Sequence, residues 1–288
     1  MDFKKIFFSL LFIVLIFLLI FSLGIKNIST NHESKKLKQF INNISQTDDL
    51  LVNCSVPELD FLPDKFSAVV GHAYGSPVLD NGFIASNLEN FFVLYKERLA
   101  SIFFTGDVFH TPSLKKWNNL FDDLGKTMIY VAPGNHDFYK DESRNIFFSS
   151  RAYRGDFPYS IEHNGMNILI DDSISSKWEL SSKLISEINN INKSLIVMRH
   201  NPPLYELEKF TNSNEGSGDL MDILQFDKTI TNFNNITWLF GDGGAFKEMP
   251  RIVCKRYKNH KFIINGLGDI PNDKILIIYD GNFYSYEI

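Results

Sequence analysis

The sequence predicts an α/β domain preceded by one transmembrane helix. After about residue 61, short apolar runs typical of buried strands alternate with amphipathic patterns typical of helices. The composition, 44% hydrophobic and 22% charged over 288 residues, is that of a globular protein and excludes a disordered or fibrous chain. Positions 6–25 carry no charged residue, and a helix of that length spans about 30 Å, the thickness of the hydrocarbon layer of a lipid bilayer.

Residues 1–25 are therefore interpreted as an N-terminal membrane anchor. Lys4 and Lys5 precede the apolar stretch and favour a cytoplasmic N-terminus, so we expect the rest of the chain on the non-cytoplasmic side of the membrane. A cleaved signal peptide is the alternative, because Ser22 and Gly24 form a small-residue cleavage pattern. In that case the domain is secreted rather than anchored.

The remaining chain divides into a polar linker or stalk, residues 26–60, and one domain, residues 61–288. Helices are predicted from amphipathic patterns and caps at 86–99 (a Ser86 and Glu89 capping box), 112–124 (Thr111 as N-cap, Gly125 as the end) and 178–191. Strands are predicted at 67–70, 101–105, 128–132, 159–162, 167–170, 194–198, 237–240, 261–264, 275–279 and 283–286. Asn164-Gly165 and Asp280-Gly281 predict the tight turns of two hairpins.

Charge and cysteine content exclude several classes of protein. The net charge is −5 with no basic stripe, so we expect no nucleic-acid partner. Only Cys54 and Cys254 occur, which excludes a disulfide-dense scaffold and a Cys-rich zinc module. The two cysteines are far apart in the sequence, so whether they form a disulfide stays open. His163 and His260 lie in surface-like contexts and are expected to be solvated.

The residues suited to chemistry all follow predicted strands. They occur in five segments: 71–75, 106–110, 134–137, 199–203 and 241–244. In layered α/β proteins, ligand sites gather at the carboxyl ends of strands. Because carboxylate oxygens and imidazole nitrogens suit Zn, Mn and Fe(II), these segments predict a divalent metal site.

The order and spacing of these motifs resemble the calcineurin-like metallophosphoesterases. Gly106-Asp107 is followed about 28 residues later by Gly134-Asn135-His136-Asp137, and His200 precedes Asn-Pro-Pro. The resemblance runs from about Phe66 to the C-terminus. It implies two packed mixed β-sheets flanked by helices, a four-layer sandwich. It also implies hydrolysis of a phosphate ester with divalent metal ions, two in number, of Mn, Fe or Zn.

The resemblance also implies roles for individual residues. Asp107 would bridge two metals, and Asn135 and His200 would bind the second of them. His136 would protonate the leaving oxygen, assisted by Asp137. A pair of cations clamps a phosphate and neutralises charge during an in-line displacement, and histidine exchanges a proton near neutral pH.

The chain departs from the family pattern at both ends. Where family members have Asp-x-His, this sequence has His72-Ala73-Tyr74, and where they have Gly-His-x-His it has Gly241-Asp242-Gly243-Gly244. His72 and Asp242 remain candidate metal ligands. His110 lies three residues after Asp107, the offset at which the related purple acid phosphatases place a metal-binding tyrosine, and is a candidate replacement ligand. Tyr74 and Arg199 are candidates for contact with substrate.

Three interpretations follow: a two-metal enzyme with rearranged ligands, a one-metal enzyme, or a catalytically inactive binding or assembly factor of the cell envelope. A nuclease is disfavoured because the chain is acidic. The long segment Leu204–Leu220 follows a ligand-bearing strand and is a candidate for substrate contact.

Overall fold

The computed structural model describes one compact unit within residues 50–288. The described residues are 50–76, 82–138, 140–191, 193–211, 220–231, 235–244, 246 and 248–288. The predicted membrane anchor and residues 26–49 of the predicted linker lie outside them. No helix formed by the described residues is both long enough and apolar enough to span a bilayer.

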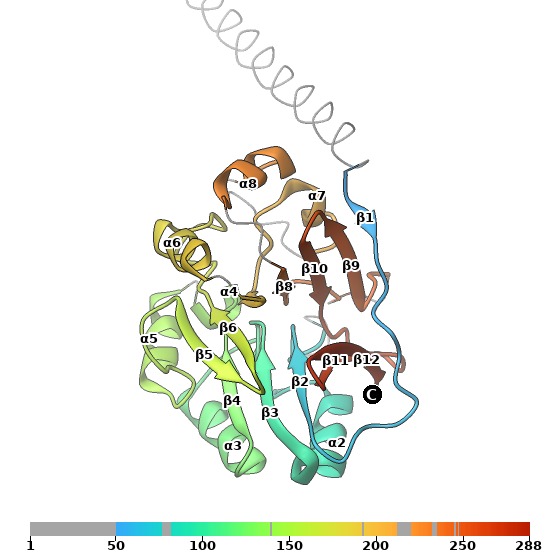
Figure 1. The fold of residues 1–288 in the computed structure, drawn as a ribbon. Coiled ribbons are helices and arrows are strands. Elements are labelled where there is room, and N and C mark those ends of the chain that lie inside the picture. The colour runs from blue at the N-terminus through green and yellow to red at the C-terminus, as the bar shows by residue number, and fades with distance from the viewer. Residues whose placement is uncertain are drawn as a thin grey trace, which may run out of the picture. The chain divides into compact units, whose positions relative to one another are not determined.

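The domain contains two mixed β-sheets (Figure 1). The first has the order β12-β11-β2-β3-β4, and the second has the order β1-β9-β10-β8-β7-β6-β5. The strands are β1 (Val52–Asn53), β2 (Phe66–Val70), β3 (Leu99–Phe104), β4 (Met128–Val131), β5 (Tyr159–His163), β6 (Met166–Ile170), β7 (Leu195–Arg199), β8 (Ile236–Phe240), β9 (Ile252–Tyr257), β10 (His260–Asn265), β11 (Lys274–Tyr279) and β12 (Asn282–Glu287). Strands β2, β3 and β4 are parallel, as are β6, β7, β8 and β10.

Helices cover the outer faces of the sheets. The helices are α2 (Ser86–Tyr95), α3 (Leu114–Leu124), α4 (Asn135–Phe138), α5 (Asp141–Ser149), α6 (Ser182–Asn190), α7 (Tyr205–Glu208) and α8 (Ile223–Thr229), with a 3-10 turn at Lys96–Arg98. Side chains of α2, α3 and α5 share a core with the five-stranded sheet. Side chains of α6, α7 and α8 share another with the seven-stranded sheet.

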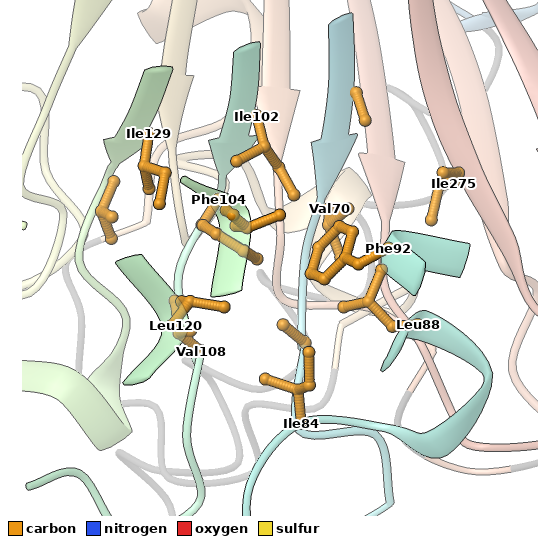
Figure 2. Close-up of a cluster of buried hydrophobic side chains, with 14 of the residues drawn as sticks. Val70, Ile84, Leu88, Phe92, Ile102, Phe104, Val108, Leu120, Ile129 and Ile275 are labelled. Atoms are coloured by element: carbon orange, nitrogen blue, oxygen red, sulfur yellow. The ribbon is translucent and has the colours of Figure 1, made fainter. Parts of the chain in front are cut away.

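Successive side chains along each strand point to opposite faces of its sheet, and this alternation produces the layers. On β3, Ile102 and Phe104 join the helix-covered core, while Phe103 lies in a third core between the two sheets. Figure 2 shows Ile102 beside Phe104 of β3, and Val70 of β2 beside Phe92 of α2. The predicted arrangement of two packed mixed sheets flanked by helices is therefore confirmed.

Some helix ends differ from the prediction. The first helix ends at Tyr95, and its N-cap is Ala85, because the Ser86 hydroxyl donates to Asp269 instead of capping the helix. The second helix begins at Leu114, since the Ser113 hydroxyl accepts a hydrogen bond from the Lys116 N–H.

The compact unit begins at Leu50, so residues 50–60 are not part of a free linker. Strand β1 pairs with β9, and Cys54 forms a disulfide with Cys254. Farther along, the Leu59 N–H donates to the Ser285 carbonyl at 2.9 Å. A ladder and a covalent bond therefore hold this segment against the domain.

The expectation that His163 and His260 are solvated is wrong. His163 Nε2 lies 2.9 Å from the Ser67 hydroxyl, in the interior. His260 is fully buried, and its Nδ1 accepts a hydrogen bond from Trp238 Nε1 at 3.2 Å. Distant segments supply these partners, and local sequence context does not show them.

We expect the domain to lose stability in acid through His260. Burial lowers the pKa of His260 to about 4, against about 6.5 in an unfolded chain. The stability contributed by the neutral imidazole is fully present above pH 6.5 and is lost as pH falls toward 4. The difference corresponds to on the order of 3 kcal/mol. Urea unfolding between pH 7 and 4.5 measures it. His260→Gln, which does not titrate, is expected to have a flatter pH dependence, and an unchanged dependence would contradict the prediction.

Candidate active site

Five strand ends bring polar side chains to one edge where the two sheets meet. His72, Asp107 and Asn135 follow β2, β3 and β4 of the five-stranded sheet, and His200 and Asp242 follow β7 and β8 of the other. His200 Nε2 lies 3.5 Å from Asp107 Oδ2, and this contact joins the two sheets. The carboxyl ends of parallel strands therefore place residues that are far apart in the sequence in one cluster.

His200 is the centre of this cluster. It is fully buried, and its Nδ1 donates to the Thr105 carbonyl at 2.9 Å. Its Nε2 faces oxygen atoms of three other side chains: Asn135 Oδ1 at 3.0 Å, Asp107 Oδ2 at 3.5 Å and Asp242 Oδ1 at 3.8 Å. Burial alone would lower the pKa of His200, but Asp107 and Asp242 outweigh it and raise the pKa above its ordinary value.

Asp107 is held in place by its neighbours along the backbone. Its φ of 55° is in the left-handed region, which few residues other than glycine adopt. Its carboxylate Oδ1 accepts a hydrogen bond from the His136 N–H at 2.9 Å. A side chain at position 134 would meet this oxygen, because a Cβ on Gly134 would lie 2.2 Å from it. The glycine of the Gly-Asn-His-Asp motif therefore allows the loops after β3 and β4 to touch.

Asp137 positions Asp107, and it does not contact His136 as we expected. Its Oδ2 accepts hydrogen bonds from the backbone N–H groups of Asp107 at 2.8 Å and Gly134 at 3.1 Å. Burial, followed by the nearby charge of Asp107, raises the pKa of Asp137 to about 7. The expected assistance to His136 is corrected, because the carboxylate is turned toward the backbone of the neighbouring loop.

His136 is oriented by the chain at His110. The imidazole is half-buried, and its Nδ1 donates to the His110 carbonyl at 2.8 Å. Its Nε2 lies 3.5 Å from the Tyr74 hydroxyl. The His110 ring packs against the rings of Tyr74 and His136, with centroids 5.4 and 4.9 Å away. His110 therefore lies beside His136, and its carbonyl selects the tautomer of that imidazole.

His72 approaches the same oxygen of Asp107 as His200 does, and Tyr74 lies beside His72. His72 Nδ1 donates to the Gly75 carbonyl, and its Nε2 lies 3.4 Å from Asp107 Oδ2 and 3.3 Å from the Tyr74 hydroxyl. Burial lowers the pKa of His72. Burial and then the charge of Asp107 raise the pKa of Tyr74 far above its ordinary value, so Tyr74 keeps its phenolic proton.

Arg199 does not have the exposed position that substrate contact requires. The side chain is fully buried, and its guanidinium donates to the carbonyls of Trp178 at 2.9 Å and Glu179 at 3.0 Å. Its Nε lies 3.6 Å from Asp171 Oδ2. These contacts brace the end of β7 immediately before His200, so the expected substrate role of Arg199 is corrected to a structural one.

Sequence reasoning missed the residues that orient Asp242. Asn201 Nδ2 donates to Asp242 Oδ2 at 2.7 Å, and the Asn201 N–H donates to the Ser173 hydroxyl at 3.0 Å. Such outer partners fix the direction of a ligating carboxylate. The only sequence signal was that Asn201 directly follows His200.

The side chains around His200 form the donor set best suited to a divalent cation. Among the described residues, no three or more His, Cys, Asp or Glu side chains form a group ready to hold a metal ion. Around His200, however, imidazole nitrogen, two carboxylates and an amide oxygen gather with no donor proton among the oxygens. Ligands about 2.1 Å from one ion lie roughly 3.0–3.5 Å apart, close to the observed spacings. This donor set fits a cation chemically.

A cavity of about 360 Å³ lies next to His136. His110, Asn135 and His136 line one side of it, and Lys140, Ser143 and Ile146 are among the residues that line the rest. Its volume is in the range of small-molecule sites. Of the segment Leu204–Leu220, residues 212–219 lie outside the described residues, and α7 forms its first turn.

Comparisons with known proteins identify the class of domain. A sequence model of the calcineurin-like phosphoesterases matches residues 80–243. Among solved structures, the chain is similar to phosphopantetheinyl hydrolase (PptH) from Mycobacterium tuberculosis, with 12% identity, a TM-score of 0.42, and coverage of 71% of this chain and 90% of that one. It is also similar to the 5'-nucleotidase of Candida albicans SC5314, with 11% identity, a TM-score of 0.40, and coverage of 77% and 49%. The chain therefore spans about half of the nucleotidase's length. No curated protein sequence matches it.

Proposed function

Because the chain belongs to the calcineurin-like phosphoesterase family, we propose that it hydrolyses a phosphate ester with the help of a bound divalent cation. One observation carries the proposal: oxygen atoms of three potential ligands face His200 Nε2, itself the fourth, and Asn135 of this set lines the same cavity as His136. The family match supports the reaction class, and the donor set supports the need for a cation.

Asp107, Asn135, His200 and Asp242 would hold the cation. When bound, it would supply Lewis-acid activation of water and neutralise charge on the phosphate. The protein's own contribution is orientation. Thr105 fixes the His200 ring through Nδ1, and Asn201 fixes the Asp242 carboxylate.

His136 would deliver the proton to the leaving oxygen. Since its Nδ1 donates to the His110 carbonyl, Nε2 is the atom that exchanges the proton with substrate. The cavity beside it would receive the leaving group. Asp137 would act indirectly, by holding the loop that carries Asp107.

We also propose that the domain lies on the non-cytoplasmic side of a membrane, anchored through residues 6–25. The uncharged stretch and the lysines before it support an anchor. The Cys54–Cys254 disulfide supports an oxidising compartment. A cleaved signal peptide would lead to the same side of the membrane.

Leaving-group dependence tests the reaction and the role of His136 together. The full chain, purified in mild detergent and loaded with Mn²⁺, Fe²⁺ or Zn²⁺, is assayed with p-nitrophenyl phosphate, bis(p-nitrophenyl) phosphate and simple alkyl phosphates. We expect hydrolysis that a chelator abolishes. His136→Asn is expected to cost about 10²–10⁴-fold with an alkyl ester, which needs a proton on the leaving oxygen, and much less with the p-nitrophenyl esters.

His260→Gln, at the opposite end of its strand from the site, is the matched histidine control and is expected to keep wild-type rates at pH 7. Metal-loaded protein that hydrolyses no ester would contradict the proposal. It would favour the catalytically inactive alternative, a phosphoesterase-fold binding or assembly factor, which the altered residues Tyr74 and Gly244 also support.

A further inference from the structure

We propose that this chain holds one divalent cation rather than a pair, because the protein itself closes the first of the two metal positions expected from its family. The inference rests on the proposed function and deepens it. The first position is the one served by the residues after β2 and by the end of the 241–244 segment. The second is the donor set around His200.

The backbone at Gly244 leaves no room for a ligand. Its φ is +84°, which side chains rarely adopt, and a Cβ there would lie 2.0 Å from the Gly266 carbonyl oxygen. The loop containing Gly266 is equally close, since a Cβ on Gly266 would lie 1.3 Å from the Gly243 carbonyl oxygen. The two loops touch backbone to backbone. The lack of a ligand side chain at position 244 therefore follows from the packing of the loops as well as from the residue type.

A fixed positive charge lies beside the same position. Arg251 Nη1 would be only 2.9 Å from a Cβ on Gly244. The guanidinium is largely buried and is held by the Phe246 carbonyl at 2.6 Å and by Asp273, whose Oδ1 lies 3.4 Å from Nε. A guanidinium stays protonated. The Arg251 side chain therefore occupies the space beside Gly244 where the family has a histidine side chain.

The remaining donors at the first position are too few. They are His72 Nε2 and Asp107 Oδ2, 3.4 Å apart. The ring of His110, the candidate replacement ligand, packs instead against the rings of Tyr74 and His136. The Tyr74 hydroxyl lies 3.3 Å from His72 Nε2, and a tyrosine ordinarily keeps its proton at neutral pH. Protein metal sites use three or four protein ligands, so two donors beside a phenol do not complete a site.

The second position, in contrast, gathers more donors. Asp107, Asn135, His200 and Asp242 supply four donors, and Asn201 orients one of them. The family match covers residues 80–243. It therefore includes all four donors and excludes His72, Tyr74 and Gly244.

Metal content is the test, with a readout that does not depend on activity. The full chain is reconstituted with Mn²⁺, freed of excess metal, and measured by plasma mass spectrometry and electron paramagnetic resonance. We expect about one Mn²⁺ per chain, with the spectrum of an isolated ion rather than of a coupled pair. Asp242→Ala is expected to reduce the content to near zero, and His72→Ala is expected to leave it at about one. Circular dichroism confirms that each variant is folded.

Different results of this experiment would overturn the single-cation inference and the proposed function. About two Mn²⁺ per chain with a coupled spectrum, or loss of metal in folded His72→Ala, would overturn the single-cation inference and leave the proposed enzyme intact. Absence of bound metal in the folded wild-type protein would overturn both.

Discussion

Asp107→Asn is expected to lower kcat/KM for phosphate-ester hydrolysis by about 10³-fold or more, and to remove most of the bound cation. The Asp107 carboxylate contacts both His72 and His200. The amide has the same shape but no charge. A cation supplies several kcal/mol of stabilisation to the charged transition state, and each 1.36 kcal/mol corresponds to a tenfold change in rate.

The substitution is expected to preserve the fold. Asparagine adopts the left-handed backbone that position 107 requires, and its Oδ1 can still accept the His136 N–H. Asp280→Asn is a matched control: the same chemical change at another position of positive φ, 48°, in an exposed hairpin turn. Steady-state kinetics and thermal melting compare the two variants. Asp107→Asn protein with wild-type activity and metal content would refute the central role of this carboxylate.

Removing the disulfide is expected to produce the largest loss of stability, about 2–5 kcal/mol in the free energy of unfolding. Cys54 and Cys254 are separated by 200 residues, so the bond strongly restricts the unfolded chain in the chain-entropy model. In the folded protein it also holds the short strand β1 to β9, where only two residue pairs form the ladder.

The double variant Cys54→Ser and Cys254→Ser tests this expectation by urea unfolding, followed by tryptophan fluorescence. Reductant provides the control: it is expected to lower the unfolding midpoint of the wild-type protein and leave that of the variant unchanged. Equal midpoints for variant and oxidised wild type would show that the cross-link contributes nothing measurable.

Much of the candidate site could be predicted because its signals are local. A short apolar strand followed by glycine and a polar residue indicates a tight turn at a strand end. Five such turns predicted a cluster of polar side chains at the edge where the carboxyl ends of the strands meet. The structure brings together His72, Asp107, Asn135, His200 and Asp242, as the parallel strands suggested. The roles of these residues in binding metal stay predictions.

The partners of the neighbouring residues could not be predicted in the same way. Asp137 lies next to His136 in the sequence but bonds to the backbone of Asp107, and Arg199 lies next to His200 but bonds to Trp178 and Glu179. Adjacent side chains point in different directions both on a helix, such as α4, and on a strand, such as β7. Proximity in the motif therefore does not determine which group a side chain contacts.

The sequence by itself determined the class of fold, most of the strands, helices α2, α3 and α6, the family and the cluster of strand-end residues. These follow from hydrophobic periodicity and turn chemistry, which act over a few residues. Only the tertiary structure decided that Cys54 meets Cys254, that His260 is buried against Trp238, and that Gly244 is closed in by Gly266 and Arg251. Each of these depends on close packing between segments remote in the sequence, and burial and steric exclusion arise only when those segments meet.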